Sequence, residues 1–210
     1  MSHYGKVPLP TLERLATYLT ALTDLKLRNV ETVSSTYLET RTGVNAAQFR
    51  KDLSYFGEFG KPGIGYDVRD LQARIGRILN LGQTQPVLLA GVGNLGSALL
   101  GYPALRAGNF KIVGAFDDDP GKIGKDVWGL AVKDIANIVA ENAELKARIG
   151  IIAVPASAAR EVAEAIVEAN VPTILNFAPV VLKLPKHIVV RNVDFVQELA
   201  VLSFHLTEKG

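Results

Sequence analysis

The sequence predicts an α/β protein made of a helical N-terminal domain and a second domain built on a parallel sheet. Residues 1–80 carry apolar residues at helical spacing and no run typical of a buried strand. After residue 86, apolar strand-like runs alternate with helical patterns, as in sheets whose parallel strands are joined by helices. The polar segment LGQTQP, residues 81–86, has the glycine and proline typical of a joint between domains.

The N-terminal domain begins with an amphipathic helix behind Pro10 and Thr11. Its apolar stripe is expected at Leu12, Leu15, Ala16, Leu19 and Leu22. A second, shorter helix is expected to follow Ser34 and Ser35 and to stop at Gly43. The first domain therefore opens with two helices.

A third helix is predicted within VNAAQFRKDLSYFG, where Asn45 can cap the first turn and Gln48 holds the third helical position, as in a capping box. Gly57 can supply the left-handed residue after the helix. The next segment, EFGKPGIGYDV, carries a glycine-rich turn between short apolar pieces and predicts a hairpin, and a last helix follows over residues 68–79. This order is that of a winged helix-turn-helix over residues 1–80.

Composition excludes several classes of site. The 210 residues include no cysteine, so disulfides and thiolate metal sites are excluded, and the formal net charge is only +2. The chain has no run of 18 apolar residues, and its start lacks the basic-then-apolar order of a signal peptide. We therefore expect a cytoplasmic protein with no membrane partner.

The second domain, residues 86–195, is predicted to be doubly wound. Its strand-like runs are VLLAGVG, FKIVGAF, GIIAVP, TILNFAP and IVVRNVDF. Continuous rather than alternating hydrophobicity is what strands buried on both faces require. The apolar helix VQELAVLSFHL follows in residues 196–210, and it can either pack on the same domain or form an interface.

A glycine-rich turn joins the first of these strands to a helix. Gly91, Gly93 and Gly96 form G-x-G-x-x-G, and the helix is expected to begin near Asn94. Asp117 ends the next strand, 21 positions after the last glycine, where an acid can bond both ribose hydroxyls and repel a 2′-phosphate. The pattern indicates a Rossmann-like site for NAD(H) rather than NADP(H). In the alternative interpretation, the glycines serve packing and Asp117 caps a turn.

No residues suited to catalysis accompany this turn. The histidines are His3, His187 and His205, and none lies in a metal-binding or serine-hydrolase motif. We therefore expect no catalytic residues and no metal, and hence a protein that is not an enzyme.

The third helix is a candidate for DNA contact. Phe49, Leu53 and Phe56 are expected to form its buried stripe. The side chains left on its other faces are Gln48, Arg50, Lys51, Ser54 and Tyr55. Arginine and glutamine suit base edges in the major groove, whereas lysine and tyrosine suit phosphates. Lys61 at the hairpin tip can reach the minor groove; the alternative for all of these is a solvated surface.

These segments together resemble the Rex family of redox-sensing transcriptional repressors. The resemblance extends over nearly the whole chain and is carried by FRKDLSYFGEFG, GIGY, GVGNLGSAL, AFDDDPGKIG, ILNFAPVVL and NVDFVQELAVLSF. It implies a homodimer that binds a palindromic operator when NADH is scarce and releases it when NADH binds. It also favours a dimer interface as the role of the C-terminal helix.

The resemblance also implies roles for individual residues. The implied DNA-contacting residues are Gln48, Arg50, Lys51, Ser54, Tyr55, Gly60, Lys61 and Gly63. The implied NADH/NAD⁺ site comprises Gly91, Val92, Gly93, Asn94, Leu95, Gly96, Tyr102, Asp117, Val154, Pro155, Asn176, Ala178, Pro179, Asp194 and Phe195. Arg14 and Asp194 resemble a pair that couples the two domains. Relatives often have arginine at the position of Pro62, so minor-groove contact here would shift to Lys61 or weaken.

Two other functions compete with this one. An NAD-dependent oxidoreductase with an added helical domain would need a positioned base, and the sequence offers none. The other is a nucleotide- or CoA-binding module whose partner is a protein rather than DNA. In that case replacing Arg50 or Lys51 would have no effect on its function.

Overall fold

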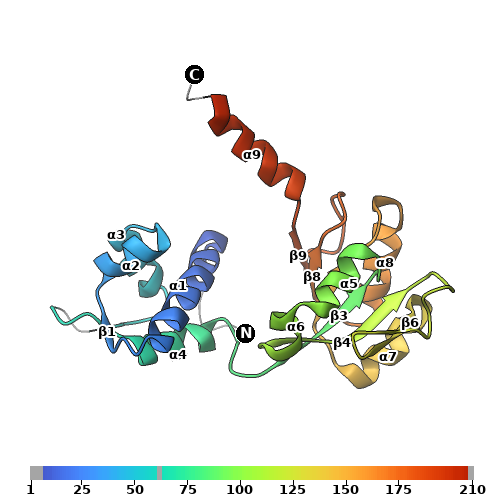
Figure 1. Cartoon of the computed structure of the whole chain (residues 1–210), viewed down its shortest axis with the longest axis horizontal. Helices are drawn as coiled ribbons and strands as arrows, with labels where there is room; N and C mark the ends of the chain where they lie inside the picture. Colours follow the sequence, from blue (N-terminus) through green and yellow to red (C-terminus); the bar gives the residue numbers. More distant parts are fainter. Residues whose placement is uncertain (1–6, 61–62, 208–210) are drawn as a thin grey trace. The chain divides into compact units, whose positions relative to one another are not determined.

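The computed structural model describes residues 7–60 and 63–207. The chain divides into two compact units, Met1–Gln83 and Thr84–Gly210, which we describe separately. Figure 1 labels their helices and strands. The fold is the expected one, with a winged helix-turn-helix unit followed by a Rossmann-like unit and a C-terminal helix.

The N-terminal unit contains four helices among its described residues. They are α1 (Leu9–Leu27), α2 (Ser35–Thr42), α3 (Ala46–Ser54) and α4 (Val68–Ile78). Its two short strands, β1 (Thr32–Val33) and β2 (Tyr66–Asp67), pair antiparallel. The side chains of Ser34 and Asn45 accept hydrogen bonds from backbone N–H groups at the starts of α2 and α3. The second and third helices therefore begin where the capping residues predict.

Two expectations for this unit are wrong in detail. Ala16 is exposed, and the buried face of α1 instead includes Tyr18, whose ring meets Phe49 edge-on at 4.8 Å between centroids. In the expected hairpin, the described residues before the turn form no strand, and β2 pairs with β1. Gly57 and Gly60 have φ of +107° and +73°, so the chain before the turn cannot run extended.

The C-terminal unit is built on a seven-stranded sheet in its described residues. In spatial order its strands are β5 (Asp126–Val127), β6 (Leu130–Asp134), β4 (Phe110–Asp117), β3 (Gln85–Ala90), β7 (Ile149–Ile152), β8 (Thr173–Asn176) and β9 (Val189–Asn192). All neighbours are parallel except β5 and β6. From β3 the chain proceeds to one side and later returns to the other, so the topological switch point lies at β3.

Helices cover both faces of this sheet. They are α5 (Asn94–Gly101), α6 (Pro103–Ala107), α7 (Ile138–Leu145), which follows a short 3₁₀ turn (Ile135–Asn137), and α8 (Ala156–Glu168). Along β3, Val87 and Leu89 join the apolar cluster that includes Leu100 of α5, whereas Leu88 joins the cluster with Ala163 of α8. Both faces of the strand are buried, which explains its unbroken apolar run.

The last helix, α9 (Phe195–Thr207), extends away from the sheet of its own unit (Figure 1). Its large apolar side chains are 56–80% exposed: Phe195, Val196, Leu199, Val201, Leu202, Phe204 and Leu206. Packing on the core of its own unit, one of the two alternatives from the sequence, is therefore not observed. In the described part of the chain, no helix is both long and apolar enough to span a membrane.

Candidate nucleotide site and nucleic-acid interface

The three glycines of this motif, two between β3 and α5 and one in the first turn of α5, differ in the space around them. Gly91 has φ of +93°, and a Cβ there would lie 2.5 Å from the carbonyl oxygen of Ala153. A Cβ on Gly96 would lie 1.9 Å from the carbonyl oxygen of Gly91, so the helix packs too closely for any side chain. A Cβ on Gly93, in contrast, would meet nothing within 4 Å. Packing alone therefore explains Gly91 and Gly96 but leaves Gly93 facing open space.

That space lies at the N-terminus of α5. The N-cap of α5 is Gly93, which has no side chain to accept from the first N–H groups of the helix. Such N–H groups, together with the helix dipole, favour a phosphate. The glycine turn therefore fits a pyrophosphate by its shape and by its donors.

Asp117, at the end of β4, is the buried carboxylate of this turn and is only 6% exposed. Its Oδ2 accepts from the N–H of Val92 at 2.7 Å, and its Oδ1 accepts from the N–H of Asp119 at 3.0 Å. Lys122 donates from Nζ to both oxygens, at 3.0 and 3.2 Å. Burial alone would raise the pKa of the Asp117 carboxyl, but these hydrogen bonds outweigh it and keep the pKa below its ordinary value. Asp117 is therefore an ionised group that fixes the glycine turn.

A cavity of about 560 Å³ opens beside these groups. Gly91, Gly93, Asp117, Val154 and Pro155 line it, as the sequence predicts of one site. The cavity is also lined by residues that were not predicted from the sequence, including Lys122 and, from α8, Glu161. The motif DDDPGKIG placed Lys122 close to Asp117 in sequence, but only the fold turns it back onto the carboxylate.

The other expected cofactor residues lie outside this cavity. Val92 is buried and bonded to Asp117, Asn94 begins α5, and Leu95 is 36% exposed. Tyr102 follows α5 and is exposed, while Ala178 is buried and Pro179 exposed in the segment after β8.

Asn176, at the end of β8, has its side chain fully engaged. Its amide donates to the carbonyls of Ala178 and Val180 and to Oδ1 of Asn192, and its oxygen accepts from the N–H of Ala178. Asn176 therefore shapes the loop after β8. It offers little to a ligand beyond that loop.

Asp194 and Phe195 stand at the start of α9. Oδ1 of Asp194 accepts from the N–H groups of Val196 and Gln197, so Asp194 caps the helix. The ring of Phe195 lies 6.2 Å from that of Phe177 between centroids. The cap fixes the first turn of α9, and the ring contact joins the start of α9 to the segment after β8.

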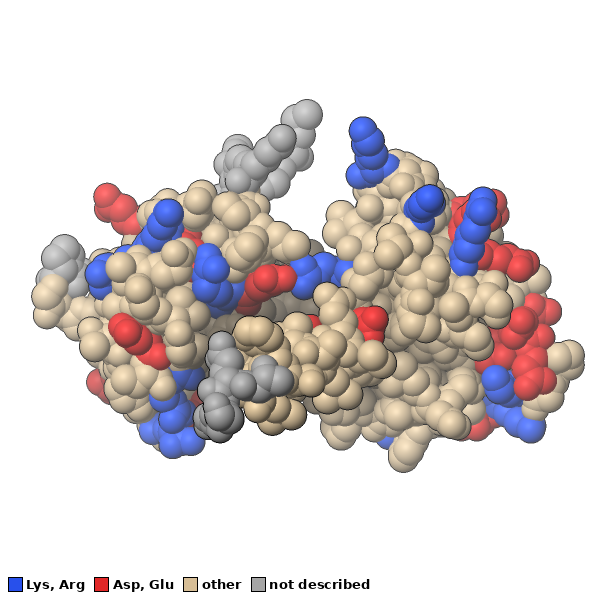
Figure 2. All heavy atoms as spheres, turned by 90° about the horizontal axis from the view of Figure 1, so that it is seen from above, with Lys and Arg blue, Asp and Glu red and all other residues tan. Residues whose placement is uncertain are grey.

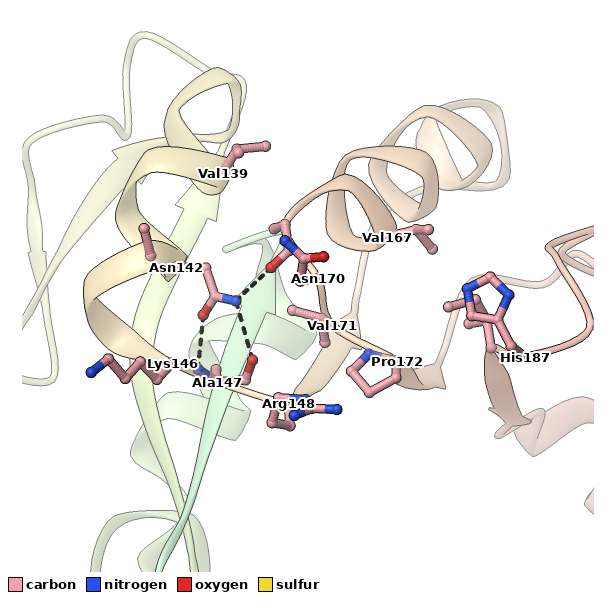
Figure 3. A pocket seen from close by; sticks show the side chains of 13 residues that line it. Val139, Asn142, Lys146, Ala147, Arg148, Val167, Asn170, Val171, Pro172 and His187 are labelled. Carbon is pink, nitrogen blue, oxygen red and sulfur yellow. Dashed lines mark hydrogen bonds between the residues drawn. The ribbon is translucent and has the colours of Figure 1, made fainter. Parts of the chain in front are cut away.

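A second groove, of about 710 Å³, lies at the opposite edge of the sheet, where β7, β8 and β9 begin (Figure 3). Its Asn142 bonds the backbone of Ala147 and Ala169 and thereby joins the ends of α7 and α8. His187 lines this groove, so it lies at the wrong edge to act on a ligand held by the glycine turn.

On the N-terminal unit, α3 presents a mixed surface. Phe49 and Leu53 are buried and Phe56 is half-buried, as expected, whereas Arg50, Lys51, Ser54 and Tyr55 are exposed. Arg50 donates to the hydroxyl of Ser35 at 2.8 Å, and the Ser54 hydroxyl donates back to the carbonyl of Lys51.

Gln48 departs from the capping-box expectation. The Asn45 side chain does accept from the N–H of Gln48, but the Gln48 amide donates to Asp52 at 2.8 Å instead of returning to the cap. This amide is therefore partly used inside the unit.

Asp52 is a fully buried carboxylate on α3 that the sequence analysis did not identify. Its donors from α1 are the hydroxyls of Thr11 and Tyr18, at 3.1 and 2.8 Å, and the guanidinium of Arg14, at 2.6 and 2.7 Å. Burial would raise the pKa of Asp52, but Arg14, Tyr18 and the remaining donors lower it below its ordinary value. Arg14, expected to meet Asp194, is thus held by Asp52 within its own unit, and its pairing with Asp194 stays a prediction.

The expected wing is only partly described. Gly60 and Gly63 have φ of +73° and +78°, as tight turns require, but Lys61 and Pro62 lie outside the described residues. Figure 2 shows both basic and acidic side chains on the visible face of the N-terminal unit. On this face the basic side chains are therefore interspersed with acidic ones.

Comparison with known proteins identifies the family. The Redox-sensing transcriptional repressor Rex of Pelotomaculum thermopropionicum is 48% identical over 204 residues, which cover 97% of this chain and 96% of the relative. The chain belongs to the Rex family. The Rex of Chloroflexus aggregans is 44% identical over 209 residues, covering 100% of this chain and 99% of its own. Family models also match, a putative DNA-binding protein N-terminus at residues 6–54 and a CoA binding domain at residues 83–180.

Solved Rex-family structures share the fold. The crystal structure of RSP in complex with β-NAD⁺ and operator DNA has a TM-score of 0.91 and 33% identity, over 97% of this chain and 94% of that chain. The complex of RSP with β-NADH has a TM-score of 0.87 and 32% identity, over 97% of this chain and 96% of that chain. RSP is itself described as a Rex-family repressor.

Proposed function

We propose that this Rex-family protein is a transcriptional repressor that senses the NADH/NAD⁺ ratio, binding a palindromic operator as a homodimer and releasing it when NADH binds. Residues 1–80 would be its DNA-binding domain, residues 86–195 its dinucleotide-binding domain and residues 196–210 its dimerisation helix. The observation that carries the proposal is the glycine turn, where Gly93 leaves room at a helix N-terminus beside an ionised Asp117.

The residues present fit a nicotinamide dinucleotide. Gly91, Gly93, Gly96 and the start of α5 would hold the pyrophosphate, and Asp117 would accept from the adenosine ribose hydroxyls. Tyr102, Ala178, Pro179 and Phe195 would surround the nicotinamide. That ring is cationic when oxidised and neutral when reduced, so an apolar surround favours NADH because desolvating an unpaired charge is costly.

For NADH to release the operator, it must bind more tightly to the arrangement of the dimer that does not bind DNA than to the one that does. A swing from almost fully bound to almost fully released needs a difference of about 5 kcal/mol between the two arrangements. The joint near residues 79–86 would be the hinge, and Arg14 and Asp194 would couple the domains. If Asp194→Ala changes neither the preference for NADH nor DNA release, this coupling is wrong.

A second copy of the chain would cover the exposed apolar residues of α9. Leu202→Asp should then shift the sedimentation of the protein from dimer to monomer, because it places a charge among the covered side chains. We infer that the protein acts in the cytoplasm, where its DNA lies.

We also propose that the protein is not an enzyme. Its named relatives are transcriptional repressors, and neither His187 nor His205 lines the cavity beside the glycine turn. Incubation of the protein with NADH and candidate carbonyl substrates should give no oxidation above the rate without protein. Turnover would favour the oxidoreductase alternative.

The proposed DNA contacts are tested by replacing basic side chains singly. Arg50→Ala and Lys51→Ala should each weaken operator binding by about tenfold, the loss of one charge-assisted contact. Lys51→Ala should also reduce the salt dependence of binding by about one phosphate contact. Lys186→Ala, an exposed lysine of the other unit, is the matched control and should bind as the unaltered protein does.

A further inference from the structure

Lys122 has no role in the proposed function, although it lies inside the nucleotide cavity. A compact turn places it there. The N–H groups of Lys122 and Ile123 both donate to the carbonyl of Asp119, at 2.9 and 3.1 Å, and the N–H of Gly121 donates to the Asp119 side chain. The turn carries the Lys122 side chain back over the end of β4, where its ammonium bonds Asp117.

Lys122 is also the one base among the described residues that line this cavity, where the acids are Asp117, Asp118 and Glu161. Its ammonium lies 3.0 Å from one oxygen of Asp117 and 3.9 Å from Oδ2 of Asp119. The side chain is still 37% exposed, so a ligand in the cavity can reach it. The Lys122 ammonium is therefore the single positively charged group among the described residues that line the cavity, and Asp117 already binds it.

This arrangement bears on the ribose that the site accepts. Unphosphorylated ribose offers two hydroxyl donors, which suit an ionised carboxylate. A 2′-phosphate instead needs cations or backbone donors and is repelled by carboxylates. Asp117 opposes such a phosphate twice, by its own charge and by occupying the one ammonium that lines the described cavity.

We propose that Lys122 is a specificity-determining residue, which Asp117 keeps from binding a 2′-phosphate and which becomes the anchor for that phosphate once Asp117 is neutralised. This inference rests on the proposed binding of NADH at the glycine turn. The site is therefore selective for NADH over NADPH because of the Asp117 and Lys122 pair, not because of the charge of Asp117 alone.

The test titrates NADH and NADPH into the full-length protein and follows the fluorescence of the bound nucleotide. The variants are Asp117→Asn, Lys122→Met and the two combined. An asparagine side chain is nearly the same size as the aspartate and keeps an oxygen for the N–H of Val92, so the glycine turn should persist, while the N–H of Asp119 loses its acceptor. Lys125→Met is the matched control, because Lys125 is an exposed lysine three residues away that does not line the cavity.

Asp117→Asn should weaken NADH by about tenfold and tighten NADPH by about tenfold, the scale of one hydrogen bond to a charged group. Adding Lys122→Met should abolish the gain for NADPH. Lys122→Met alone should weaken NADH by less than about tenfold and give no gain for NADPH. Lys125→Met should change neither affinity.

The inference is overturned if the double variant binds NADPH as tightly as Asp117→Asn does, because the gain would then come only from removing a negative charge. If the unaltered protein binds NADH but no variant changes its preference, Lys122 has no part in specificity and the proposed function stands. If the unaltered protein binds neither dinucleotide, both proposals fail. Should Asp117→Asn not fold, Asp117→Ser with and without Lys122→Met makes the same comparison.

Discussion

Two buried carboxylates, Asp52 in the N-terminal unit and Asp117 in the C-terminal unit, look alike by burial and by the direction of their pKa shifts. Their partners differ. Asp52 accepts only from side chains, of α1 and of its own helix, and lines no described cavity. Asp117 accepts from the backbone of the glycine turn and from a half-exposed lysine, beside an open cavity.

The difference teaches that a depressed pKa and deep burial do not by themselves mark a ligand site. Asp52 locks α3 onto α1 and so fixes the orientation of the helix proposed to contact DNA. Asp117 has a carboxylate that a ligand can approach. Access from a cavity, rather than ionisation, separates the structural role from the binding role.

The largest expected effect is on stability. Asp52→Ala should lower the free energy of unfolding by about 3 kcal/mol, because it leaves Arg14 and Tyr18 without their buried acceptor. Urea unfolding followed by circular dichroism measures this loss. Asp70→Ala, which removes only an exposed partner of Arg74, should cost under about 1 kcal/mol. If the two variants lose the same free energy of unfolding, the proposed structural role of Asp52 is wrong.

The next largest effects are expected in the glycine turn. There one substitution should weaken NADH binding and another should lower the stability of the fold. Gly93→Ala should leave the melting temperature nearly unchanged, since its Cβ has room, but should weaken NADH by about tenfold or more. Gly96→Ala should destabilise the fold, because its Cβ would lie 1.9 Å from a backbone oxygen. Calorimetric melting and NADH titration measure the two effects. Normal NADH binding by a folded Gly93→Ala protein would contradict the proposed pyrophosphate position.

Acid should destabilise both units through these carboxylates. Each has its pKa below the ordinary value in the folded protein, so its contribution to stability is complete above the unfolded pKa of about 4 and is lost as pH falls toward the folded pKa. Trp128, the single tryptophan, lies in the C-terminal unit and reports on that unit by fluorescence. In the Asp117→Asn variant, the stability of the C-terminal unit that this fluorescence reports should fall less steeply as the pH is lowered. In the Asp52→Asn variant, its pH dependence should be the same as in the unaltered protein.

The smallest effect is expected at Gln48, where one amide donor is already held by Asp52. Gln48→Ala should weaken operator binding by under about threefold, less than half the free energy of one charge-assisted contact. Anisotropy of a labelled operator, with Arg50→Ala titrated alongside, compares the two. A larger loss for Gln48→Ala than for Arg50→Ala would mean that Gln48 leaves Asp52 to read a base.

Local patterns in the sequence were enough to predict most elements. Ser34 and Asn45 cap the helices where expected, α4 covers Val68–Ile78 against the predicted residues 68–79, and the helix after the glycine turn begins at Asn94, as expected. These features depend on neighbours within a few positions of one another. Asp117 accepts from the N–H of Asp119 in the following turn, as the alternative interpretation expects, and it lines a cavity, but its binding of a ribose stays a prediction.

What the sequence did not reveal depends on distant partners. Asp52 looks like one more polar residue on a helix, and its burial follows from Thr11, Arg14 and Tyr18, which lie 34 to 41 positions away. The pairing of β2 with β1, across α2 and α3, has no local signal. Lys122 is the exception, because its contact with Asp117 spans only five positions and follows from the local turn at Asp119.

The measurement that tests the central claim most directly is an anisotropy titration of a labelled palindromic operator, selected from random duplexes, with NADH and with NAD⁺. We predict that NADH abolishes binding and that NAD⁺ largely spares it. If the unaltered protein binds a selected duplex equally well with either nucleotide, or binds none, the account of a nucleotide-sensing repressor is contradicted.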